Sequence, residues 1–285
     1  MTVGAAAMAA SLGSFRAGAQ TSNVSWPVWT VSDGQRSLYL VAETPPRQAD
    51  WHDGRIQGLL GQCSHLWTET NQIMPADMPA LIDHWGITAG HPYTASLNEV
   101  DRRRLGEAAA YCKTDLTPYA QYRPWVVAAT LEDAYYAAAG QIGLSADRVL
   151  SAQAEKQKLA RSSEFPTKAD VITWFGGMSR EQDVQFLRYT LDEVVAGPAA
   201  GARIYDAWAR GDMHAATAEV QRASRAYPDL IQRLTFARNL AWMPRFKAIL
   251  SSSTKAMVVV GLYHMVGPEG ILALAPSHGF SVRRV

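Results

Sequence analysis

The stretch Lys255–Val285, KAMVVVGLYHMVGPEGILALAPSHGFSVRRV, decides the fold of this chain. It opens with Ala256–Val260, a run of small and β-branched apolar residues without a turn residue, which is typical of a buried strand. The strand is predicted to end at Gly261, His264 follows three residues later, and Gly267–Gly270 marks a turn. Open α/β sheets present functional groups just past the carboxyl ends of their strands, so His264 is a candidate functional residue. The alternative is a hydrogen-bonded turn histidine without chemistry.

Further strands are predicted near both ends of the chain. Ile271–Leu274 has the pattern of a short helix, and Gly279–Val285 has that of a closing strand. Near the N-terminus, Pro27–Ser32 and Ser37–Glu43 are apolar or alternating runs separated by Asp33-Gly34. An Asp-Gly pair between two such runs predicts a β-hairpin.

The middle of the chain is predicted to be mostly helical. Glycine and proline separate helical patterns over 50–62, 79–85, 97–112, 126–139, 147–159, 171–178, 180–195, 199–210, 213–226 and 229–250. Ser64–Thr70 alternates like a strand, whereas Lys158–Ser163 is polar and suits a buried strand poorly. Since no stretch reads as a linker, the chain is predicted to form one domain.

The composition indicates a globular protein and excludes several functions. Of the 285 residues, 48% are apolar and 19% are charged, which provides material for a core without a disorder signature. A net charge of +1 argues against nucleic acid as a partner, because phosphate binding needs a concentrated basic surface. Arg102–Arg104 is the only basic run and is expected on a solvated helix face. Motifs of serine hydrolases, zincins, dinucleotide-binding proteins and P-loop proteins are missing.

Residues 1–19 are predicted to be the remnant of a signal peptide. They are apolar and free of acidic residues, and Ala17-Gly18-Ala19 has the Ala-x-Ala form of a cleavage site. A positive n-region is missing, because the first basic residue is Arg16. The mature domain is then 20–285, in the periplasm or secreted, or in the cytoplasm if the segment is not cleaved. No other window approaches the length of a membrane span.

The chain contains two cysteines, Cys63 and Cys112. In an exported protein an even number of cysteines permits a disulfide, and the alternative is two buried free thiols. No Cys-x-x-C or Cys/His cluster occurs, which excludes the usual structural zinc sites.

The C-terminal motifs resemble the signature of the TraB/GumN family. Its members finish with a strand, a Gly-x-x-His motif, a Gly-x-x-Gly turn, a short helix and a strand. Gly261-Leu262-Tyr263-His264 and Gly267-Pro268-Glu269-Gly270 match this order. Tyr122–Trp125, Ala207–Asp212 and Ala237–Trp242 are similar to further family segments, the last to an "RN..W" motif. The resemblance covers roughly 26–285.

The sequence departs from the family pattern at two positions. The family's first histidine motif, usually Gly-Thr-x-His, is replaced by Ala42-Glu43-Thr44-Pro45. Proline cannot serve as a ligand, a base or a hydrogen-bond donor. Glu43 or the downstream His52 are the candidates to replace the lost histidine. The second departure is Ser145, which stands where relatives usually carry an aspartate.

The resemblance implies an α/β (α+β) fold of one domain, with a mixed central β-sheet flanked by many helices. It also implies that histidines and glutamates meet in a cleft. Glu69, at the end of the third strand, and Glu164, in the segment that matches the family's Leu-Glu-Thr, are the candidate carboxylates. The alternative for Glu69 is an exposed strand end, and for Glu164 a cap or loop position.

The remaining site residues are also implied by the resemblance. His264, Glu69 and Arg238 are the candidate catalytic residues, and His264, Glu69 and Glu164 are the candidate ligands of Mn²⁺, Co²⁺ or Zn²⁺. Arg238 would orient a glutamate or, with Glu43, bind substrate, and the alternative for Arg238 is a structural salt bridge. The expected structural residues are Gly261, Gly267, Gly270 and Asn239.

Two functional hypotheses follow. Because animal relatives called Tiki are metal-dependent proteases, the first is a metal-dependent hydrolase, in particular a peptidase, acting on a small-molecule or peptide substrate. The second is a degenerate exported member that keeps the fold and acts as a non-enzymatic binding protein, which Pro45 and Ser145 favour.

Overall fold

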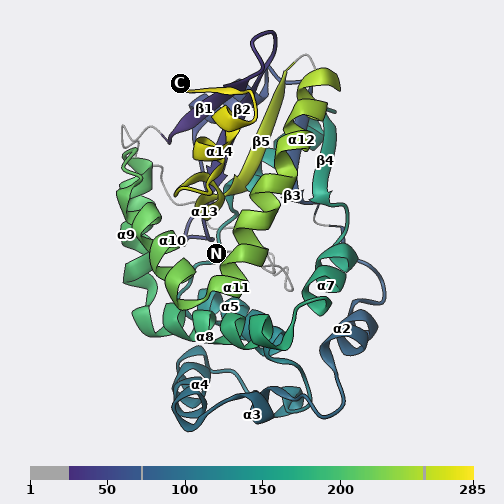
Figure 1. The fold of residues 1–285 in the computed structure, drawn as a ribbon, viewed down its shortest axis with the longest axis vertical. Coiled ribbons are helices and arrows are strands. Elements are labelled where there is room, and N and C mark those ends of the chain that lie inside the picture. The colour runs from purple at the N-terminus through teal and green to yellow at the C-terminus, as the bar shows by residue number, and fades with distance from the viewer. Residues whose placement is uncertain (1–25, 72, 253–254) are drawn as a thin grey trace.

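A six-stranded mixed sheet forms one end of the molecule in the computed structural model, which describes residues 26–71, 73–252 and 255–285 (Figure 1). The strand order is β4-β3-β5-β2-β1-β6. In chain order the strands are β1 Val28–Ser32, β2 Ser37–Glu43, β3 His65–Thr70, β4 Ala160–Phe165, β5 Ala256–Gly261 and β6 Ser281–Arg284. Strands β4, β3, β5 and β2 are parallel neighbours, and β1 is antiparallel to both β2 and β6. The predicted single α/β domain with a mixed sheet is therefore confirmed.

The predicted hairpin joins β1 to β2. Its turn is set by Asp33, whose carboxylate accepts hydrogen bonds from the backbone N–H groups of Gln35 and Arg36. Gly34 has a φ of 93°, a conformation that glycine adopts without strain. The turn is thus determined by the Asp-Gly pair itself, which is why the sequence predicted it correctly.

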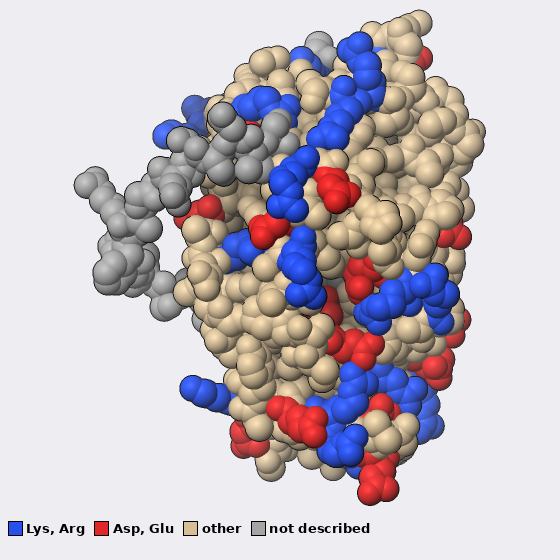
Figure 2. Space-filling model, turned by 90° about the vertical axis from the view of Figure 1, so that its left-hand side faces the viewer, with Lys and Arg blue, Asp and Glu red and all other residues tan. Residues whose placement is uncertain are grey.

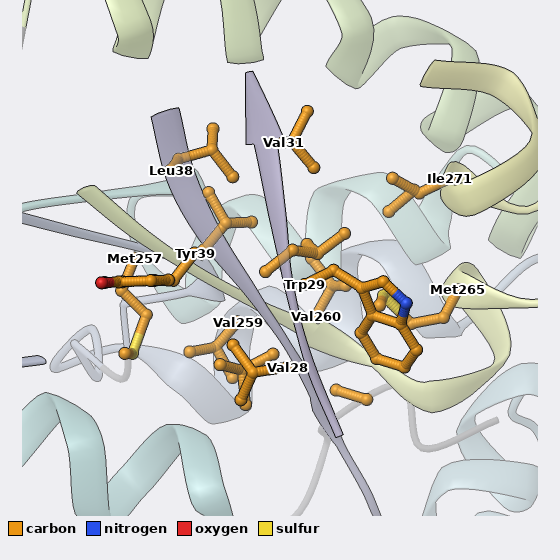
Figure 3. Packing of buried hydrophobic residues seen from close by; sticks show 14 of the residues in the cluster. Val28, Trp29, Val31, Leu38, Tyr39, Met257, Val259, Val260, Met265 and Ile271 are labelled. Atoms are coloured by element: carbon orange, nitrogen blue, oxygen red, sulfur yellow. The ribbon is translucent and has the colours of Figure 1, made fainter. Parts of the chain in front are cut away.

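Strand β5 lies at the centre of the sheet, between β3 and β2. Its residues Ala256–Val260 are all buried, which explains why the run is apolar throughout instead of alternating. Figure 3 shows part of this core, in which side chains of β1, β2 and β5 are joined by Met265 and Ile271 from the segment after β5. The polar strand β4 is an edge strand, where its exposed side chains meet water.

Helices flank the sheet and build the other end of the molecule (Figure 1). They are α1 Gly54–Leu60, α2 Met78–Gly86, α3 Tyr93–Ser96, α4 Glu99–Cys112, α5 Pro124–Ala138, α6 Ala146–Lys156, α7 Lys168–Gly176, α8 Arg180–Ala196, α9 Pro198–Ala209, α10 His214–Ala226, α11 Pro228–Ile231, α12 Ala237–Ser252, α13 Leu262–Met265 and α14 Ile271–Ser277, with a 3₁₀ turn at Thr117–Tyr119. A second hydrophobic cluster lies among α4, α5, α7 and α8. The sheet and the helical end thus have separate cores.

The structure differs from the sequence expectation at two places close to β5. The single helix predicted over 229–250 is divided into α11, a π-helical turn at Gln232–Phe236, and α12. His264 lies in the one-turn helix α13 and not in an open turn. Both differences concern the segments that carry the candidate site.

The remaining expectations concern the termini, the cysteines and the surface. Cys63 and Cys112 are free and buried, in the sheet core and the helical core respectively, and burial raises the pKa of both thiols. The predicted signal peptide lies outside the described residues. Among the described helices, none is long and apolar enough to cross a membrane.

The basic run on α4 is divided between two acidic partners. Arg104 pairs with Asp192 on α8, and Arg103 lies near Glu107 on the exposed side of its own helix. On the face that Figure 2 shows, Lys and Arg side chains are mixed with Asp and Glu side chains over the lower half. Charges of both signs on one face fit the small net charge of the chain.

Candidate functional site

The candidate carboxylates lie at the carboxyl ends of neighbouring parallel strands. Glu69 is the second-last residue of β3, and Glu164 holds the same place in the adjacent β4. On the other side of β5, Glu43 ends β2 directly opposite Gly261. Glu164 is therefore a strand residue, which excludes the cap or loop alternative. Parallel strands bring their carboxyl ends to one edge of the sheet, so residues far apart in sequence meet there.

Arg238, in the first turn of α12, binds both glutamates of this edge. Its Nη2 lies 2.5 Å from Oε2 of Glu69 and 2.6 Å from Oε2 of Glu164, and its Nε lies 2.9 Å from the same Glu164 oxygen. The guanidinium side chain is only 6% exposed, and those of Glu69 and Glu164 are 15% and 11% exposed. Charge-assisted hydrogen bonds of this kind are among the strongest in proteins. The predicted salt bridge thus exists, and an action of Arg238 on substrate stays a prediction.

The surroundings of Arg238 are aromatic. The guanidinium carbon lies 4.9 Å from the ring centre of Trp242, one helical turn later, and 5.4 Å and 5.5 Å from those of Phe165 and Trp174. Nη1 donates to the carbonyl of Leu234 in the π-helical turn, at 3.1 Å. Single π-helical turns occur frequently at functional sites. The "RN..W" segment therefore places a guanidinium and the ring of Trp242 on one face of α12, and Phe165 of β4 and Trp174 of α7 add the other two rings.

Asn239 determines the tautomer of His264. The Asn239 amide nitrogen donates to the carbonyls of His264 and Glu269, at 3.2 Å and 2.7 Å, so the amide oxygen faces Nδ1 of His264 at 2.6 Å. Nδ1 must therefore carry the proton, and Nε2 is left as an acceptor. Nη1 of Arg238 lies 3.3 Å from Nε2 and donates to it. The predicted structural role of Asn239 agrees with these contacts.

Burial keeps His264 neutral. It lowers the pKa of the imidazole to about 3, a shift that Glu69 opposes and Arg238 reinforces. The ring of Trp242 packs on the imidazole, with ring centres 4.5 Å apart. Burial alone would raise the pKa of Glu69, but Arg238 and the N–H of Gly261 together hold that pKa below its usual value. The site thus combines a neutral imidazole with an ionised Glu69.

The glycines of the two C-terminal motifs each have a structural reason. The N–H of Gly261 donates to Oε1 of Glu69 at 2.5 Å, and a Cβ on Gly261 would lie only 3.2 Å from the same oxygen. Gly267 has a φ of 84°. A Cβ on Gly270 would lie 2.4 Å from the carbonyl oxygen of Val266. At these three positions of the sequence, the course of the backbone therefore favours a residue without a side chain.

Glu43 belongs to a second polar group at the same edge. Burial, together with the charges of Asp147 and Glu69, raises the pKa of Glu43 well above its usual value, and a hydrogen bond from Ser145 opposes this shift. Lys168, at the start of α7, is 6% exposed, and burial lowers its pKa. Ser145, the second departure from the family pattern, is thus a partner of Glu43. Asp147 and Lys168 were missed because one sequence gives no sign that the first turns of α6 and α7 bring their charges close to the end of β2.

Pro45, the residue in place of the first histidine, lines a cavity of about 420 Å³. The loop after β2, the ends of α5 and α8, the start of α9, and Tyr263 on α13 enclose this cavity. Glu69, Glu164, Arg238 and His264 are not among the lining residues. These four residues form a closed polar cluster at the edge of the sheet, and the open cavity lies beside this cluster.

A divalent metal ion does not fit the closed cluster while Arg238 is in place. The candidate ligand atoms, Oε2 of Glu69, Oε2 of Glu164 and Nε2 of His264, all face the guanidinium. A catalytic zinc site needs three protein ligands around an open position, and here the cation of Arg238 fills that position. Within the described ranges no group of three or more His, Cys, Asp or Glu side chains is arranged to hold a metal ion.

Comparison with known proteins gives the family. The profile of the TraB/PrgY/gumN family matches residues 27–284. The chain belongs to this family. The match extends from β1 to β6 and includes every residue of the cluster, which confirms the family resemblance of the C-terminal motifs. No curated protein matches the chain.

Proposed function

We propose that this TraB/PrgY/gumN family member is a non-enzymatic protein that binds a small molecule or a peptide at the carboxyl edge of its sheet. One observation carries the proposal, namely that Arg238 binds Glu69 and Glu164 and faces Nε2 of His264. The two carboxylates raise the pKa of the Arg238 guanidinium, so it stays charged and cannot activate water as a metal ion does. A histidine with a pKa near 3 is also a weak general base at neutral pH.

The cavity beside the cluster supports the binding part of the proposal. Ligands of open α/β sheets bind outside the carboxyl ends of the strands, and a volume of about 420 Å³ lies within the usual range of ligand pockets. The proposal includes export to the periplasm or the medium, which rests on the Ala-x-Ala form of residues 17–19.

A metal-dependent hydrolase is the second candidate, and the tautomer of His264 favours it. Metal-binding histidines usually donate one ring nitrogen to a neighbouring oxygen and coordinate with the other, as the Asn239 contact permits here. Nε2 of His264 and Oε2 of Glu69 are 3.7 Å apart, which is compatible with two ligands of one ion. Arg238 would have to leave its position for this to happen.

Metal retention separates the two candidates. The purified chain and its His264→Ala variant are loaded with Mn²⁺, Co²⁺ or Zn²⁺, desalted, and compared for bound metal and thermal stability. A ligand that binds only the folded state raises its stability by mass action. We expect no bound metal and no metal-dependent shift for either protein.

The control variant is His65→Ala, which removes a histidine at the opposite end of β3, where its ring contacts Ser162. If the unchanged chain and the His65→Ala variant retain close to one metal ion and the His264→Ala variant does not, the binding proposal is wrong. The hydrolase candidate then stands, and peptide hydrolysis is the next assay.

A further inference from the structure

Four tyrosines form much of the wall of the cavity beside the cluster. Tyr135 and Tyr136 come from the end of α5, Tyr205 from α9 and Tyr263 from α13. Within the described ranges, none of these four hydroxyls takes part in a hydrogen bond, and each stays accessible to solvent. A hydroxyl can both donate and accept a hydrogen bond. The wall therefore offers a ligand several groups that can pair with donors and with acceptors.

These hydroxyls are concentrated in a largely buried part of the wall. Tyr135 and Tyr136 are each 7% exposed, and their ring centres are 5.5 Å apart. Tyr263 is among the groups that raise the pKa of Tyr136, so the hydroxyls of these two residues lie near each other. Thr44, after β2, adds a further hydroxyl without a hydrogen bond to the described residues, and it is 5% exposed. Buried polar groups in proteins are generally hydrogen-bonded, so this wall suits a ligand that brings several polar atoms.

Two acidic side chains of the cavity are paired with arginines. Asp192 binds Arg104 and Arg222, and Glu219 binds Arg222. The side chains of Asp192, Glu219 and Arg222 are 26%, 21% and 43% exposed, so a ligand can still reach their outer atoms. The charges of these carboxylates and guanidiniums cancel. This part of the wall therefore offers planar hydrogen-bonding groups without requiring a charged ligand.

Among the described lining residues, the other two charged side chains have opposite signs. Glu193 accepts a hydrogen bond from the hydroxyl of Tyr189 at 3.0 Å. The guanidinium carbon of Arg47 lies 4.4 Å from the ring centre of Tyr205. A ligand with a net charge would lose hydration without meeting a wall of opposite net charge, which is costly. The cavity therefore favours a neutral ligand.

The faces of the tyrosine rings favour a particular kind of neutral ligand. An aromatic face is negative, and the C–H bonds of a saturated ring that carries hydroxyls have small positive partial charges. Such a ring can pack on the aromatic face while the hydroxyls at its rim pair with the polar groups of the wall. A sugar ring has both properties and no charge. A volume of about 420 Å³ lies within the range of small-molecule sites.

We propose that the cavity binds a neutral saccharide. The sugar ring packs on the faces of Tyr136 and Tyr263, and its hydroxyls pair with the tyrosine hydroxyls, with Thr44 and with the ion pair of Asp192 and Arg222. The inference rests on the proposed binding function and names the ligand class of that cavity.

The test uses four neutral probes that share a saturated six-membered ring. Three are the methyl pyranosides of glucose, galactose and mannose, and the fourth is cyclohexanol, which carries a single hydroxyl. NMR titration of the full chain at pH 7 gives the affinity for each probe. We expect at least one sugar to bind at least about tenfold more tightly than cyclohexanol, because each additional hydrogen bond to the wall adds to the affinity. A smaller advantage for all three sugars would overturn the inference.

Charged analogues test the preference for a neutral ligand. The sugar that binds best is compared with its analogues that carry a carboxylate or an ammonium group at the exocyclic carbon. We expect both analogues to bind at least about threefold more weakly, because each brings a net charge to a wall whose charges cancel. An equal or higher affinity of either analogue would contradict the neutral class.

Variants that each remove one hydroxyl assign the site. Tyr136→Phe and Tyr263→Phe keep the ring, and we expect each to weaken binding of the best sugar by about threefold to tenfold. Tyr119→Phe is the matched control, because it removes a hydroxyl from the 3₁₀ turn outside the cavity, and its affinity should be unchanged. Unchanged affinity in both Tyr136→Phe and Tyr263→Phe would contradict the assignment, as would an equal loss in Tyr119→Phe.

The outcome is independent of the metal experiment. A chain that retains a metal ion through His264 overturns the proposed binding function whatever the sugars do. A chain that binds neither metal nor any of the three sugars contradicts the ligand class alone.

Discussion

The two polar regions at the carboxyl edge of the sheet are built in opposite ways. Around Arg238, one buried guanidinium is shared by the carboxylates of Glu69 and Glu164, and the hydrogen bonds of Glu69, His264 and Asn239 join the same cluster. On α5, one turn before the two tyrosines that line the cavity, Glu132 is buried and its carboxyl oxygens have no hydrogen-bond partner among the described residues. The difference teaches that one edge of a sheet can hold a cluster closed by an internal cation and, close by, a buried carboxyl group that lacks a hydrogen bond.

The largest expected effect comes from Arg238→Ala, which would leave Glu69 and Glu164 buried without their cation. Removal of one partner of a buried ion pair costs about 3–5 kcal/mol, and we expect a loss of this size in the free energy of unfolding measured with urea. The control is Arg103→Ala, whose exposed pair with Glu107 contributes at most about 0.5 kcal/mol. A loss below about 1 kcal/mol for Arg238→Ala would show that the cluster is not closed.

Acid is expected to destabilise the protein through His264. Its pKa is near 3 in the folded chain and near 6.5 when exposed, so between these values the unfolded chain binds the additional proton. The contribution of the neutral His264 to the free energy of unfolding is complete above pH 6.5. It falls by about 1.4 kcal/mol per pH unit as the pH drops towards 3.

The measurement is urea unfolding at pH steps from 7 to 4, with His264→Gln as the variant that lacks this titration. Glu69, whose pKa is also lowered, adds a loss of the same sign at the acidic end of the range. Equal pH dependence of the unchanged chain and the variant between pH 6.5 and 5 would contradict the prediction.

Glu132→Gln is expected to have a smaller effect of the opposite sign. Because the folded chain raises the pKa of Glu132, its contribution to stability is complete below about pH 4.5 and decreases as the pH rises. The glutamine variant does not titrate, so it should gain about 1–2 kcal/mol relative to the unchanged chain between pH 5 and pH 8. Urea unfolding at both pH values measures this gain, and a difference between the two proteins that does not change with pH would contradict the raised pKa of Glu132.

The sequence predicted the elements whose signals are local. The hairpin at Asp33-Gly34, the buried strand β5 and the C-terminal glycine turn were correct because a few adjacent residues determine each of them. The sequence pattern did not fit β4 well, because the pattern that was sought is that of a buried strand. Strand β4 is an edge strand, and its exposed positions are polar.

The contents of the site were only partly predictable. The family motifs identified Glu69, Glu164, Arg238 and His264, and the structure brings all four together. The sequence does not show that the Arg238 guanidinium fills the space between Glu69, Glu164 and His264, because this depends on how α12 lies over the sheet. Glu132 had a weak signal, a carboxylate in the apolar run of α5, but its coupling to Glu193 requires the packing of α5 against α8.

The π-helical turn at Gln232–Phe236 makes the spacing of this helix as important as its composition. The N–H of Ala237 donates to the carbonyl of Gln232, five residues back, so this turn holds one residue more than a turn of α-helix does. Because the wide turn takes up the additional residue, deleting one residue there would restore a regular α-helix and leave Arg238, Asn239 and Trp242 close to their present orientation. A single lost codon in this turn would therefore change the turn beneath the site without substituting or rotating the residues of the site.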